Sequence, residues 1–312
     1  MQALDYQTLF SSFSDKKLFF DHSLKKFTTF RVGGNADVLL LPSDLEEIQL
    51  ALDICQHNDI PVQILGRGSN VLISDKGIRG LTIYMHSNFN RVEVKGNKII
   101  ANAGVSLASL AALAAKNSLT GLEFASGIPG SLGGAILMNA SSYDSEMKNI
   151  VQNSIYMNKN NEIKKLHKEE HQFAYRKSIY STGNNIILSA ELQLEDGNRF
   201  DIYDKIADFQ VQRRNSQPLE KHSGGSAFKR PTGYFAGKLI SDAGLKGYRS
   251  QNAGVSEKHA GFIVNHGNAT ASEINAVFKH VKEEVKKQFD IDLEPEVKWL
   301  GDWTEEEIAW KL

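Results

Sequence analysis

The sequence has very little cysteine, no long apolar run and almost no surplus of charge of either sign. Its single cysteine, Cys55, excludes an intramolecular disulfide and a zinc site built from thiolates. The 36 lysines and arginines balance 37 acidic residues, so a net charge of −1 gives the chain no electrostatic reason to bind nucleic acid or anionic lipid. The most apolar stretch, residues 105–115, is too short to span a bilayer. We therefore expect no nucleic-acid partner and no membrane insertion.

The first residues also lack the pattern of a secretory signal. Met1 to Asp5 show neither a basic start nor an apolar segment of signal-peptide length. The apolar residues around Cys55 recur at helical spacing, so we interpret this thiol as buried rather than reactive. We expect a soluble, cytoplasmic protein that is a monomer.

Length and composition favour a folded chain of about two domains. Apolar residues make up 41% of the 312 residues and charged residues 23%, which are ordinary globular values. The order of predicted elements gives a helical lead-in at residues 1–25, a mixed domain rich in antiparallel pairing at 26–200 and a smaller domain at 201–312. The predicted class is α+β.

Apolar periodicity and capping residues predict the main elements. We expect Ser43 with Glu46, Ser106 and Ser272 to cap helices. Two predicted helices end near residues 58 and 117, and four others span residues 132–138, 201–214, 235–243 and 271–289. The predicted strands are 37–41, 61–65, 71–75, 185–194, 261–265 and 297–300, with hairpins at 91–103 and 150–166.

Two segments rich in glycine are candidates for binding a cofactor. The first, Leu65-Gly66-Arg67-Gly68-Ser69-Asn70, lies between two predicted strands, which excludes a Rossmann fingerprint and leaves a tight turn or a nest of amides for a pyrophosphate. The second, Gly127-Ile128-Pro129-Gly130-Ser131-Leu132-Gly133-Gly134, precedes a short apolar helix. It favours a flat or diphosphate-bearing cofactor, or equally the tight packing of a helix on a sheet.

Three polar motifs have both a chemical and a structural interpretation. Residues 167–171 match the H-x-x-E-H zinc pattern, but a solvated charged helix is the better interpretation and we assign no metal. A guanidinium stands beside a phenol in Tyr175-Arg176-Lys177-Ser178. This pair is either a functional group or part of a surface turn with a salt bridge. Ser226 follows two glycines and precedes Lys229 and Arg230. The segment is not G-x-S-x-G and shows no His and Asp partners, which disfavours a hydrolase nucleophile. The remaining functional interpretation is a serine that donates a proton in an anion-binding loop.

Together these segments resemble the UDP-N-acetylenolpyruvoylglucosamine reductase (MurB) family from about residue 26 to residue 301. The resemblance rests on seven segments in family-like order: residues 28–37, 65–70, 121–131, 175–178, 225–229, 255–262 and 293–297. It implies an FAD-binding domain of the vanillyl-alcohol-oxidase (PCMH) type followed by a smaller α+β substrate-binding domain. The chain is similar to the shorter family type, which lacks a substrate-capping Tyr insertion.

The resemblance also implies an activity in the synthesis of peptidoglycan precursors. Noncovalently bound FAD would take hydride from NADPH and pass it to the enolpyruvyl group of UDP-N-acetylglucosamine enolpyruvate, giving UDP-N-acetylmuramate. The catalytic positions of the family fall on Arg176, Ser226 and Glu296. We expect the two glycine-rich segments to hold the flavin, and Tyr175, Arg214, Lys229 and Arg230 to bind substrate, with solvated charge as the alternative for the cations.

The chain departs from the usual family sequence at two loops. Residues 139–144 have Ser141 and Asp144 where the family usually has glycine, and residues 251–254 differ from the usual glycine-rich run. Two other functions remain open. A flavin oxidase of the same superfold is disfavoured because no His or Cys for covalent attachment lies between His57 and His86. A non-catalytic flavin- or UDP-sugar-binding relative is disfavoured because all three catalytic matches are present.

Overall fold

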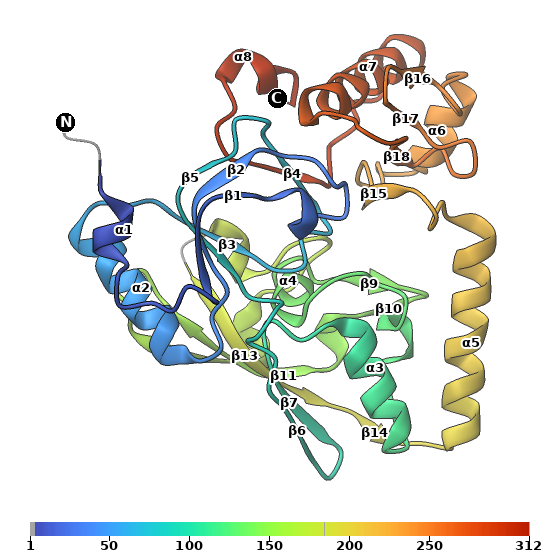
Figure 1. The fold of residues 1–312 in the computed structure, drawn as a ribbon. Coiled ribbons are helices and arrows are strands. Elements are labelled where there is room, and N and C mark those ends of the chain that lie inside the picture. Colours follow the sequence, from blue (N-terminus) through green and yellow to red (C-terminus); the bar gives the residue numbers. More distant parts are fainter. Residues whose placement is uncertain (1–3, 184, 312) are drawn as a thin grey trace. The chain divides into compact units, whose positions relative to one another are not determined.

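The computed structural model describes residues 4–183 and 185–311 (Figure 1). Its contacts divide the chain into two compact units, each assembled from separated segments. Unit 1 contains residues up to 19, 39–67 and 81–213, and unit 2 contains residues 20–38, 68–80 and those from 214 onward. The domains predicted from the sequence, with limits at residues 25 and 200, are consecutive stretches of the chain, whereas each unit combines separated segments. These predicted limits stay a prediction.

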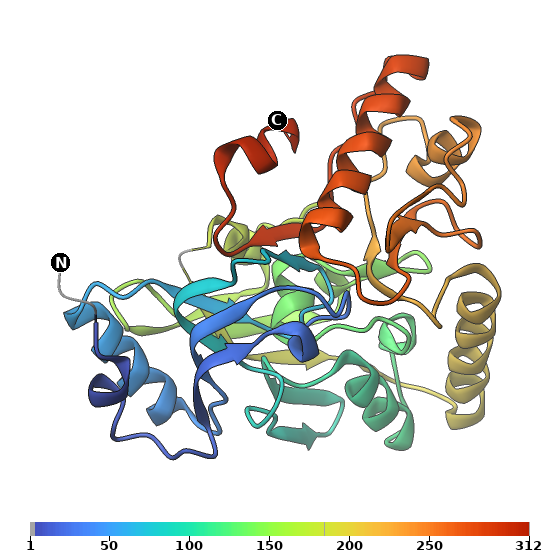
Figure 2. The same cartoon turned by 45° about the horizontal axis from the view of Figure 1, so that its top comes forward.

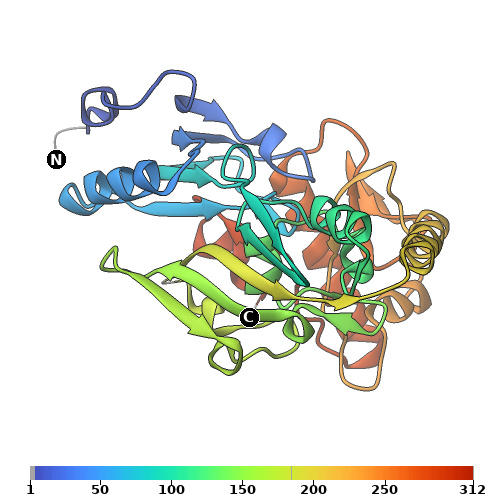
Figure 3. The ribbon, with the colours of Figure 1, turned by 90° about the horizontal axis from the view of Figure 1, so that it is seen from below.

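Unit 1 is built on an antiparallel sheet of five strands in the order β12-β11-β13-β7-β6. Long strands β11 and β13 pair side by side in its middle (Figure 3). Both hairpins expected from the sequence are confirmed, because Gly96 and residues 158–162 provide their turns. The strands are β6 (Val92–Lys95), β7 (Lys98–Asn102), β11 (Val151–Met157), β12 (Ile163–His167) and β13 (Ile186–Gln193).

The helices of this unit follow the predicted periodicity. Ser106 caps its helix as expected, since its hydroxyl accepts a hydrogen bond from the amide of Ser109. The predicted Ser43 cap is wrong by one residue: Asp44 is the N-cap, and the Glu47 carboxylate accepts from the amide of Ser43. The helices are α1 (Tyr6–Leu9), α2 (Leu45–His57), α3 (Leu107–Lys116), α4 (Leu132–Leu137) and α5 (Arg199–Ser216).

Cys55 is buried in α2, as expected, and burial raises the pKa of its thiol to about 12. The thiolate that redox and metal chemistry require is therefore scarce at neutral pH.

A second sheet has the order β1-β2-β5-β3 and corrects one expectation. The expected helical lead-in at residues 1–25 is wrong, because within the described residues 4–25 the α-helix covers Tyr6–Leu9 alone and residues 18–23 form a strand. Leu18 and the two following phenylalanines have high strand propensity, and Leu18 is buried. The strands are β1 (Leu18–Ser23), β2 (Asn35–Leu40), β3 (Val62–Leu65) and β5 (Ile78–Tyr84). Two short ladders join β8 (Leu119–Thr120) to β14 (Glu195–Asp196) and β9 (Ser141–Ser142) to β10 (Ser145–Glu146).

Unit 2 contains an antiparallel sheet in the order β15-β18-β17-β16, and helix α7 packs on it (Figure 2). The α7 side chains at helical spacing that were expected to face inward, Ile274, Phe278, Val281 and Val285, are all fully buried. The strands are β15 (His222–Ser226), β16 (Arg249–Ser250), β17 (Ala253–Val255) and β18 (Phe262–Asn265); the helices are α6 (Ala236–Asp242) and α7 (Ala271–Phe289).

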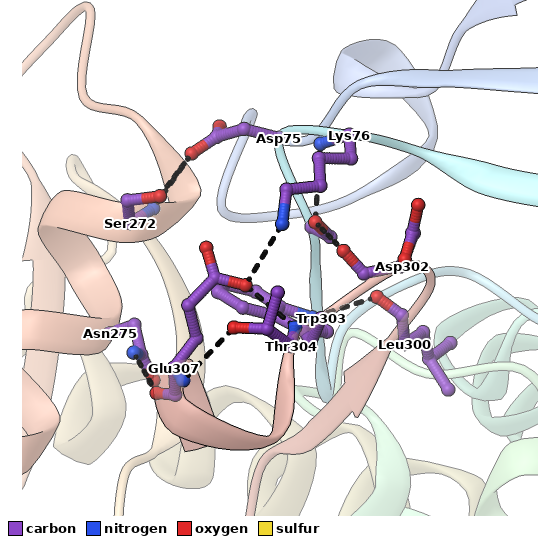
Figure 4. Close-up of polar contacts among 10 residues, drawn as sticks. Asp75, Lys76, Ser272, Asn275, Leu300, Asp302, Trp303, Thr304 and Glu307 are labelled. Atoms are coloured by element: carbon purple, nitrogen blue, oxygen red, sulfur yellow. Dashed lines mark hydrogen bonds and ion pairs between the residues drawn. The ribbon is translucent and has the colours of Figure 1, made fainter.

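The N-terminus of α7 is capped differently from the prediction. Thr270 is the N-cap, in a capping box with Glu273, and the predicted cap Ser272 lies inside the first turn. Ser272 instead shares the carboxylate of Asp75, which accepts from the Ala271 and Ser272 amides and from the Ser272 hydroxyl (Figure 4). A carboxylate at this end of a long helix is favourable.

The last segment of the chain also attaches to residues 71–76. Strand β19 (Lys298–Leu300) pairs in parallel with β4 (Val71–Ile73). The short helix α8 (Glu305–Ile308) follows, and Glu307 accepts a hydrogen bond from Lys76 at 3.3 Å (Figure 4). Strand β19 begins two residues after Glu296, so this pairing fixes the backbone that carries that residue. No helix of residues 4–183 and 185–311 has both the length and the apolar character needed to cross a membrane.

Candidate active site

The first glycine-rich segment begins in unit 1, where it meets the second. Leu65 ends β3, is buried, and accepts a hydrogen bond from the amide of Met85 at 2.9 Å. A Cβ atom added to Gly66 would lie 2.5 Å from the Ser131 hydroxyl oxygen. Any side chain at position 66 would therefore separate the two segments, and the structure brings them together as the sequence analysis required of a shared cofactor site.

Two serine hydroxyls, one directly before the second segment and one within it, are available for a ligand. The Ser126 hydroxyl oxygen is buried and has no hydrogen-bond partner in the described residues. Ser131 occupies the N-cap of α4, but its side chain makes no capping hydrogen bond. A buried hydroxyl without a partner is costly unless a ligand or water satisfies it. Pro129, Gly130 and Gly134 complete a segment with no ionisable side chain.

Two glycines of this segment are also explained by packing within unit 1. A Cβ on Gly133 would lie 2.9 Å from the Cβ of Ala103, and the Gly133 amide donates to the Ala103 carbonyl. Gly127 lies against Arg213, whose guanidinium donates to the Gly127 carbonyl. Burial lowers the pKa of this guanidinium. The alternative of tight packing therefore holds at these two positions, whatever ligand the segment binds.

The rest of the first segment belongs to unit 2, where it contacts the strand after Glu296. Gly68 is buried, and its carbonyl accepts a hydrogen bond from the amide of Thr29 at 3.0 Å. The Asn70 side chain donates to the Glu296 carbonyl at 3.2 Å. The Asn70 carbonyl accepts from the amide of Lys298 at 3.0 Å. A predicted flavin-binding residue thus lies directly beside a predicted catalytic one.

Ser226 and Glu296 lie on neighbouring extended segments of unit 2. Ser226 is the last residue of β15, and the next residue, Ala227, accepts a hydrogen bond from the Glu296 amide at 2.9 Å. Phe228 and Pro295 form an isolated antiparallel bridge one residue further along each segment. These main-chain bonds place the two predicted catalytic residues in one register, although 70 positions separate them in the sequence.

Glycine occupies the two positions before Ser226 for different reasons. A Cβ on Gly224 would collide with the ring of Phe30, so packing within the protein accounts for this glycine. Gly225 has a φ of +79°, which disfavours other residues, and no atom lies within 4 Å of the Cβ position. Ser226 is exposed, and the residue before it has open space at its Cβ position.

Two of the predicted substrate-binding cations, Lys229 and Arg230, have side-chain partners in unit 2. Lys229 forms an ion pair with Glu294, whose side chain is 68% exposed. The Arg230 guanidinium lies 3.9 Å from the centre of the Phe235 ring. Arg214 is exposed, and its carbonyl accepts a hydrogen bond from Lys258. Exposed pairs of this kind exchange readily for a ligand, since each contributes only about 0–1 kcal/mol.

Arg176 lies in unit 1 on a tight turn. The amide of Ala174 and the amide of Lys177 donate to each other's carbonyls at 2.9 and 3.1 Å, which leaves Tyr175 and Arg176 at the tip. Arg176 has a φ of +55°, a conformation that an arginine adopts only when its surroundings impose it. Its guanidinium donates through Nη1 to the Ser141 hydroxyl oxygen at 2.6 Å. Tyr175 is 53% exposed, with its ring centre 5.1 Å from the Arg176 guanidinium carbon.

Sequence reasoning missed the residue that holds this turn. Asn139 is 1% exposed, and its side-chain nitrogen donates to the Ala174 carbonyl at 3.2 Å and to Glu146 at 2.9 Å. Its side-chain oxygen accepts from the amide of Lys148 at 3.0 Å. An asparagine directly after a predicted short helix is the available signal, because asparagine tolerates the left-handed backbone at helix ends. Asn139 indeed has a φ of +43°.

The H-x-x-E-H motif matches the expected solvated helix only in part, because residues 168–171 form a short 3-10 helix in which residues 168–170 are exposed and His171 is buried. His167 ends β12, and His171 is fully buried, with its Nε2 at 2.7 Å from the Ser154 hydroxyl. The same hydroxyl lies 2.6 Å from the Tyr180 hydroxyl, and burial raises the pKa of Tyr180 to about 12. Residues 4–183 and 185–311 contain no group of three or more His, Cys, Asp or Glu that could hold a metal ion. This buried network flanks the Arg176 turn on both sides in sequence.

Two family models match the chain. Residues 36–166 match the model described as an FAD binding domain, and residues 217–300 match the C-terminal domain of UDP-N-acetylenolpyruvoylglucosamine reductase. The expected fold class, an FAD-binding domain followed by a smaller α+β domain, is confirmed. The residues present fit FAD, because Gly66 and Ser131 approach each other closely within the segments predicted to hold it, and the buried Ser126 hydroxyl directly before the second segment has no hydrogen-bond partner in the described residues.

Curated relatives and a solved structure match nearly the whole chain. UDP-N-acetylenolpyruvoylglucosamine reductase of Caldanaerobacter subterraneus subsp. tengcongensis is 46% identical over 92% of this chain and 94% of its own length. The protein of that name in Clostridium beijerinckii is 42% identical over 96% and 98%. The crystal structure of UDP-N-acetylenolpyruvylglucosamine reductase from Thermus caldophilus superposes with a TM-score of 0.77 at 32% identity, over 91% of this chain and 98% of that one. The chain belongs to the UDP-N-acetylenolpyruvoylglucosamine reductase family.

Proposed function

We propose that the protein uses NADPH and FAD to reduce the enolpyruvyl group of UDP-N-acetylglucosamine enolpyruvate to UDP-N-acetylmuramate. The observation that carries the proposal is the main-chain register between the Ser226 and Glu296 segments. That register lies within the part of the chain matched by the reductase C-terminal domain. A flavin oxidase without this activity would have no need of it.

The flavin is held by the two glycine-rich segments in this proposal. Leu65, Gly66, Arg67, Gly68, Ser69 and Asn70 supply backbone amides and three polar side chains, and Gly127, Ile128, Pro129, Gly130, Ser131, Gly133 and Gly134 supply further backbone groups. Bound FAD supplies hydride transfer, which no side chain of the protein performs. We expect noncovalent attachment, so acid precipitation should release all the flavin into the supernatant.

Arg176 stabilises negative charge on the substrate. Addition of hydride to the alkene carbon β to the carboxylate moves electron density to the α carbon and the carboxyl oxygens. A fixed guanidinium aimed at those oxygens stabilises the developing charge more than water does, because it needs no reorganisation. The turn geometry and the bond to Ser141 support this role, since they hold the guanidinium before substrate arrives.

Glu296 and Ser226 complete the reaction from unit 2. A protonated Glu296 donates a hydrogen bond to the substrate carboxylate, and Ser226 gives its proton to the α carbon. A serine hydroxyl is a weak acid in water, but an enolate-like carbanion is basic enough to take its proton. The position of Ser226 beside the open space at Gly225 supports access of a ligand to this hydroxyl.

The UDP diphosphate is bound by Arg214, Lys229 and Arg230, and Tyr175 contacts substrate next to Arg176. Lys229 exchanges its exposed partner Glu294 for phosphate in this proposal. We also propose a monomeric protein in the cytoplasm, for which the lone buried Cys55 is suited because it needs no oxidising compartment. Sedimentation equilibrium of the holoprotein tests the oligomeric state, and cell fractionation tests the location.

Anaerobic rapid mixing tests the activity itself. The holoprotein should be yellow, NADPH should bleach it, and the enolpyruvyl substrate should restore the colour with one UDP-N-acetylmuramate formed per flavin. Reoxidation by oxygen but not by the substrate would replace this proposal with an oxidase. Flavin that NADPH never bleaches would leave a binding protein without turnover.

A further inference from the structure

Ser141 contacts the proposed catalytic Arg176 from a rigid hairpin of unit 1. Its hydroxyl oxygen accepts a hydrogen bond from Arg176 Nη1 at 2.6 Å, a short distance typical of a charge-assisted bond. Ser141 is the first residue of β9, opposite Glu146 of β10. It stands at a position where the family usually has glycine, which has no hydroxyl to offer.

The hairpin that carries Ser141 is fixed at its tip. Tyr143 and Asp144 both have positive φ values, 51° and 58°, as a two-residue hairpin turn requires. The Tyr143 ring stacks on Phe209 of α5 with 3.9 Å between ring centres and 3° between planes. The Tyr143 hydroxyl donates to the Phe209 carbonyl at 2.9 Å. Ser141 therefore has a defined position independent of any ligand.

The turn that carries Arg176 is fixed to the same region by its backbone. Asn139 links the Ala174 carbonyl to Glu146, which is the strand partner of Ser141. On the other side of the turn, the Ser178 hydroxyl donates to the Leu137 carbonyl at 2.9 Å. These contacts are made by the backbone on either side of Arg176 and do not involve its guanidinium. The bond from Ser141 acts on the guanidinium itself.

We propose that Ser141 is a positioning residue for Arg176. Its hydroxyl selects one orientation of the guanidinium and so lowers the cost of ordering it when charge develops on the substrate. The inference rests on the proposed function, because it requires Arg176 to stabilise that charge. Loss of the hydroxyl should slow flavin reoxidation by the substrate about tenfold, the usual order for one hydrogen bond to a charged group.

The test compares serine variants in the holoprotein by anaerobic rapid mixing. Ser141→Ala should slow reoxidation about tenfold without changing flavin reduction by NADPH, and Ser141→Thr, which keeps the hydroxyl, should recover most of the rate. Ser142→Ala is the matched control. Its side chain alternates to the other face of β9 and makes no hydrogen bond to another residue of 4–183 and 185–311, so both half-reactions should be unchanged.

A double-mutant cycle shows whether Ser141 acts through Arg176. In an Arg176→Ala background, Ser141→Ala should cause no further slowing, and the thermal midpoint of the single Ser141→Ala variant should stay near that of the wild type. An unchanged reoxidation rate in Ser141→Ala, or a full tenfold loss that persists without Arg176, would overturn the inference while the proposed function stands. Normal reoxidation in Arg176→Ala alone would instead refute the role of Arg176, and the inference with it.

Discussion

The two units hold their proposed catalytic residues by different means. In unit 1, the Arg176 turn depends on side chains: Asn139 binds its backbone and Ser141 its guanidinium. In unit 2, Ser226 and Glu296 depend on main-chain bonds, in which Ala227 accepts from the Glu296 amide and donates to the Gly261 carbonyl. The carboxyl of Glu296 and the hydroxyl of Ser226 take no part in those main-chain bonds.

In unit 2, the side chains proposed for the chemistry are therefore not the groups that join their segments. In unit 1, side chains hold the turn that carries the proposed catalytic residue. A main-chain bond survives substitution of the side chain on either residue, so the bonds that join these two segments remain when Ser226 or Glu296 is changed. A side-chain bond disappears with its residue, so Asn139 carries both the stability of the Arg176 turn and its function. The predictions below test that contrast.

The largest effect on stability is expected for Asn139→Ala. The change removes one of the two donors to the Ala174 carbonyl, leaves the Lys148 amide without its side-chain acceptor, and places alanine at a buried position with a positive φ. The free energy of unfolding should fall by about 3 kcal/mol, measured by urea denaturation of the holoprotein. Asn117→Ala is the control: Asn117 is exposed and binds only the Leu113 carbonyl with its side chain, so its loss should be below about 1 kcal/mol. Equal losses in the two variants would contradict the coupling.

Glu296→Gln should have a large effect on turnover and almost none on folding. Reoxidation of the flavin by the enolpyruvyl substrate should slow by about 10²-fold, since the amide is a weaker donor to the carboxylate than a protonated carboxyl. Reduction by NADPH should survive, and the thermal midpoint should match that of the wild type because the main-chain bonds remain. A parallel loss in both half-reactions would mean that the carboxyl supports the structure.

Arg176→Gly should give a more stable protein than Arg176→Ala, by about 1 kcal/mol. Glycine adopts the φ of +55° at this position without the Cβ penalty that alanine bears. Both variants lack the guanidinium, so both should reoxidise equally slowly. Urea denaturation compares the two, and an alanine variant as stable as the glycine variant would show that the turn is not strained.

A smaller, pH-dependent effect is expected from His171. Burial lowers the pKa of this imidazole below 6.5, against the weaker opposing influence of hydrogen bonds to the backbone of Lys168 and His167 and of the charges on Glu170 and Glu169. The unfolded chain therefore binds a proton before the folded one, so stability is full above pH 6.5 and falls as the pH drops below it. In His171→Gln this loss should be reduced, as measured by unfolding free energies across the acid range. Identical pH dependence in both proteins would exclude His171 as a contributor.

Much of the fold follows from local sequence signals, and the exceptions have physical causes. Both hairpins and helix α7 were predictable because turn residues and apolar spacing agreed with the tertiary packing. The caps at Asp44 and Thr270 were misassigned by one and two residues, since neighbouring serines and acids offer nearly equal capping chemistry. Strand β1 was missed because its partner β2 lies further along the chain, so no local pattern shows the pairing.

The candidate site likewise contains features that local sequence signals predict and features that depend on distant contacts. Glycine spacing indicated where backbone approaches something closely, but could not tell packing from ligand: Gly224 makes room for Phe30, whereas Gly225 faces open space. Asn139 and Ser141 gave little signal because their partners, Ala174 and Arg176, lie about 35 residues away in the chain. Contacts of that range depend on the whole fold of the unit.

The most direct test concerns Ser226, the proposed proton donor, whose segment is fixed by main-chain bonds. The variant Ser226→Ala should bind FAD, keep its thermal midpoint and accept hydride from NADPH at the normal rate. Reoxidation by the enolpyruvyl substrate should slow by about 10²-fold or more in anaerobic rapid mixing, and Ser226→Cys, with a more acidic but larger group, should recover part of that loss. Near-normal reoxidation in the alanine variant would contradict the account and leave water or another residue as the donor.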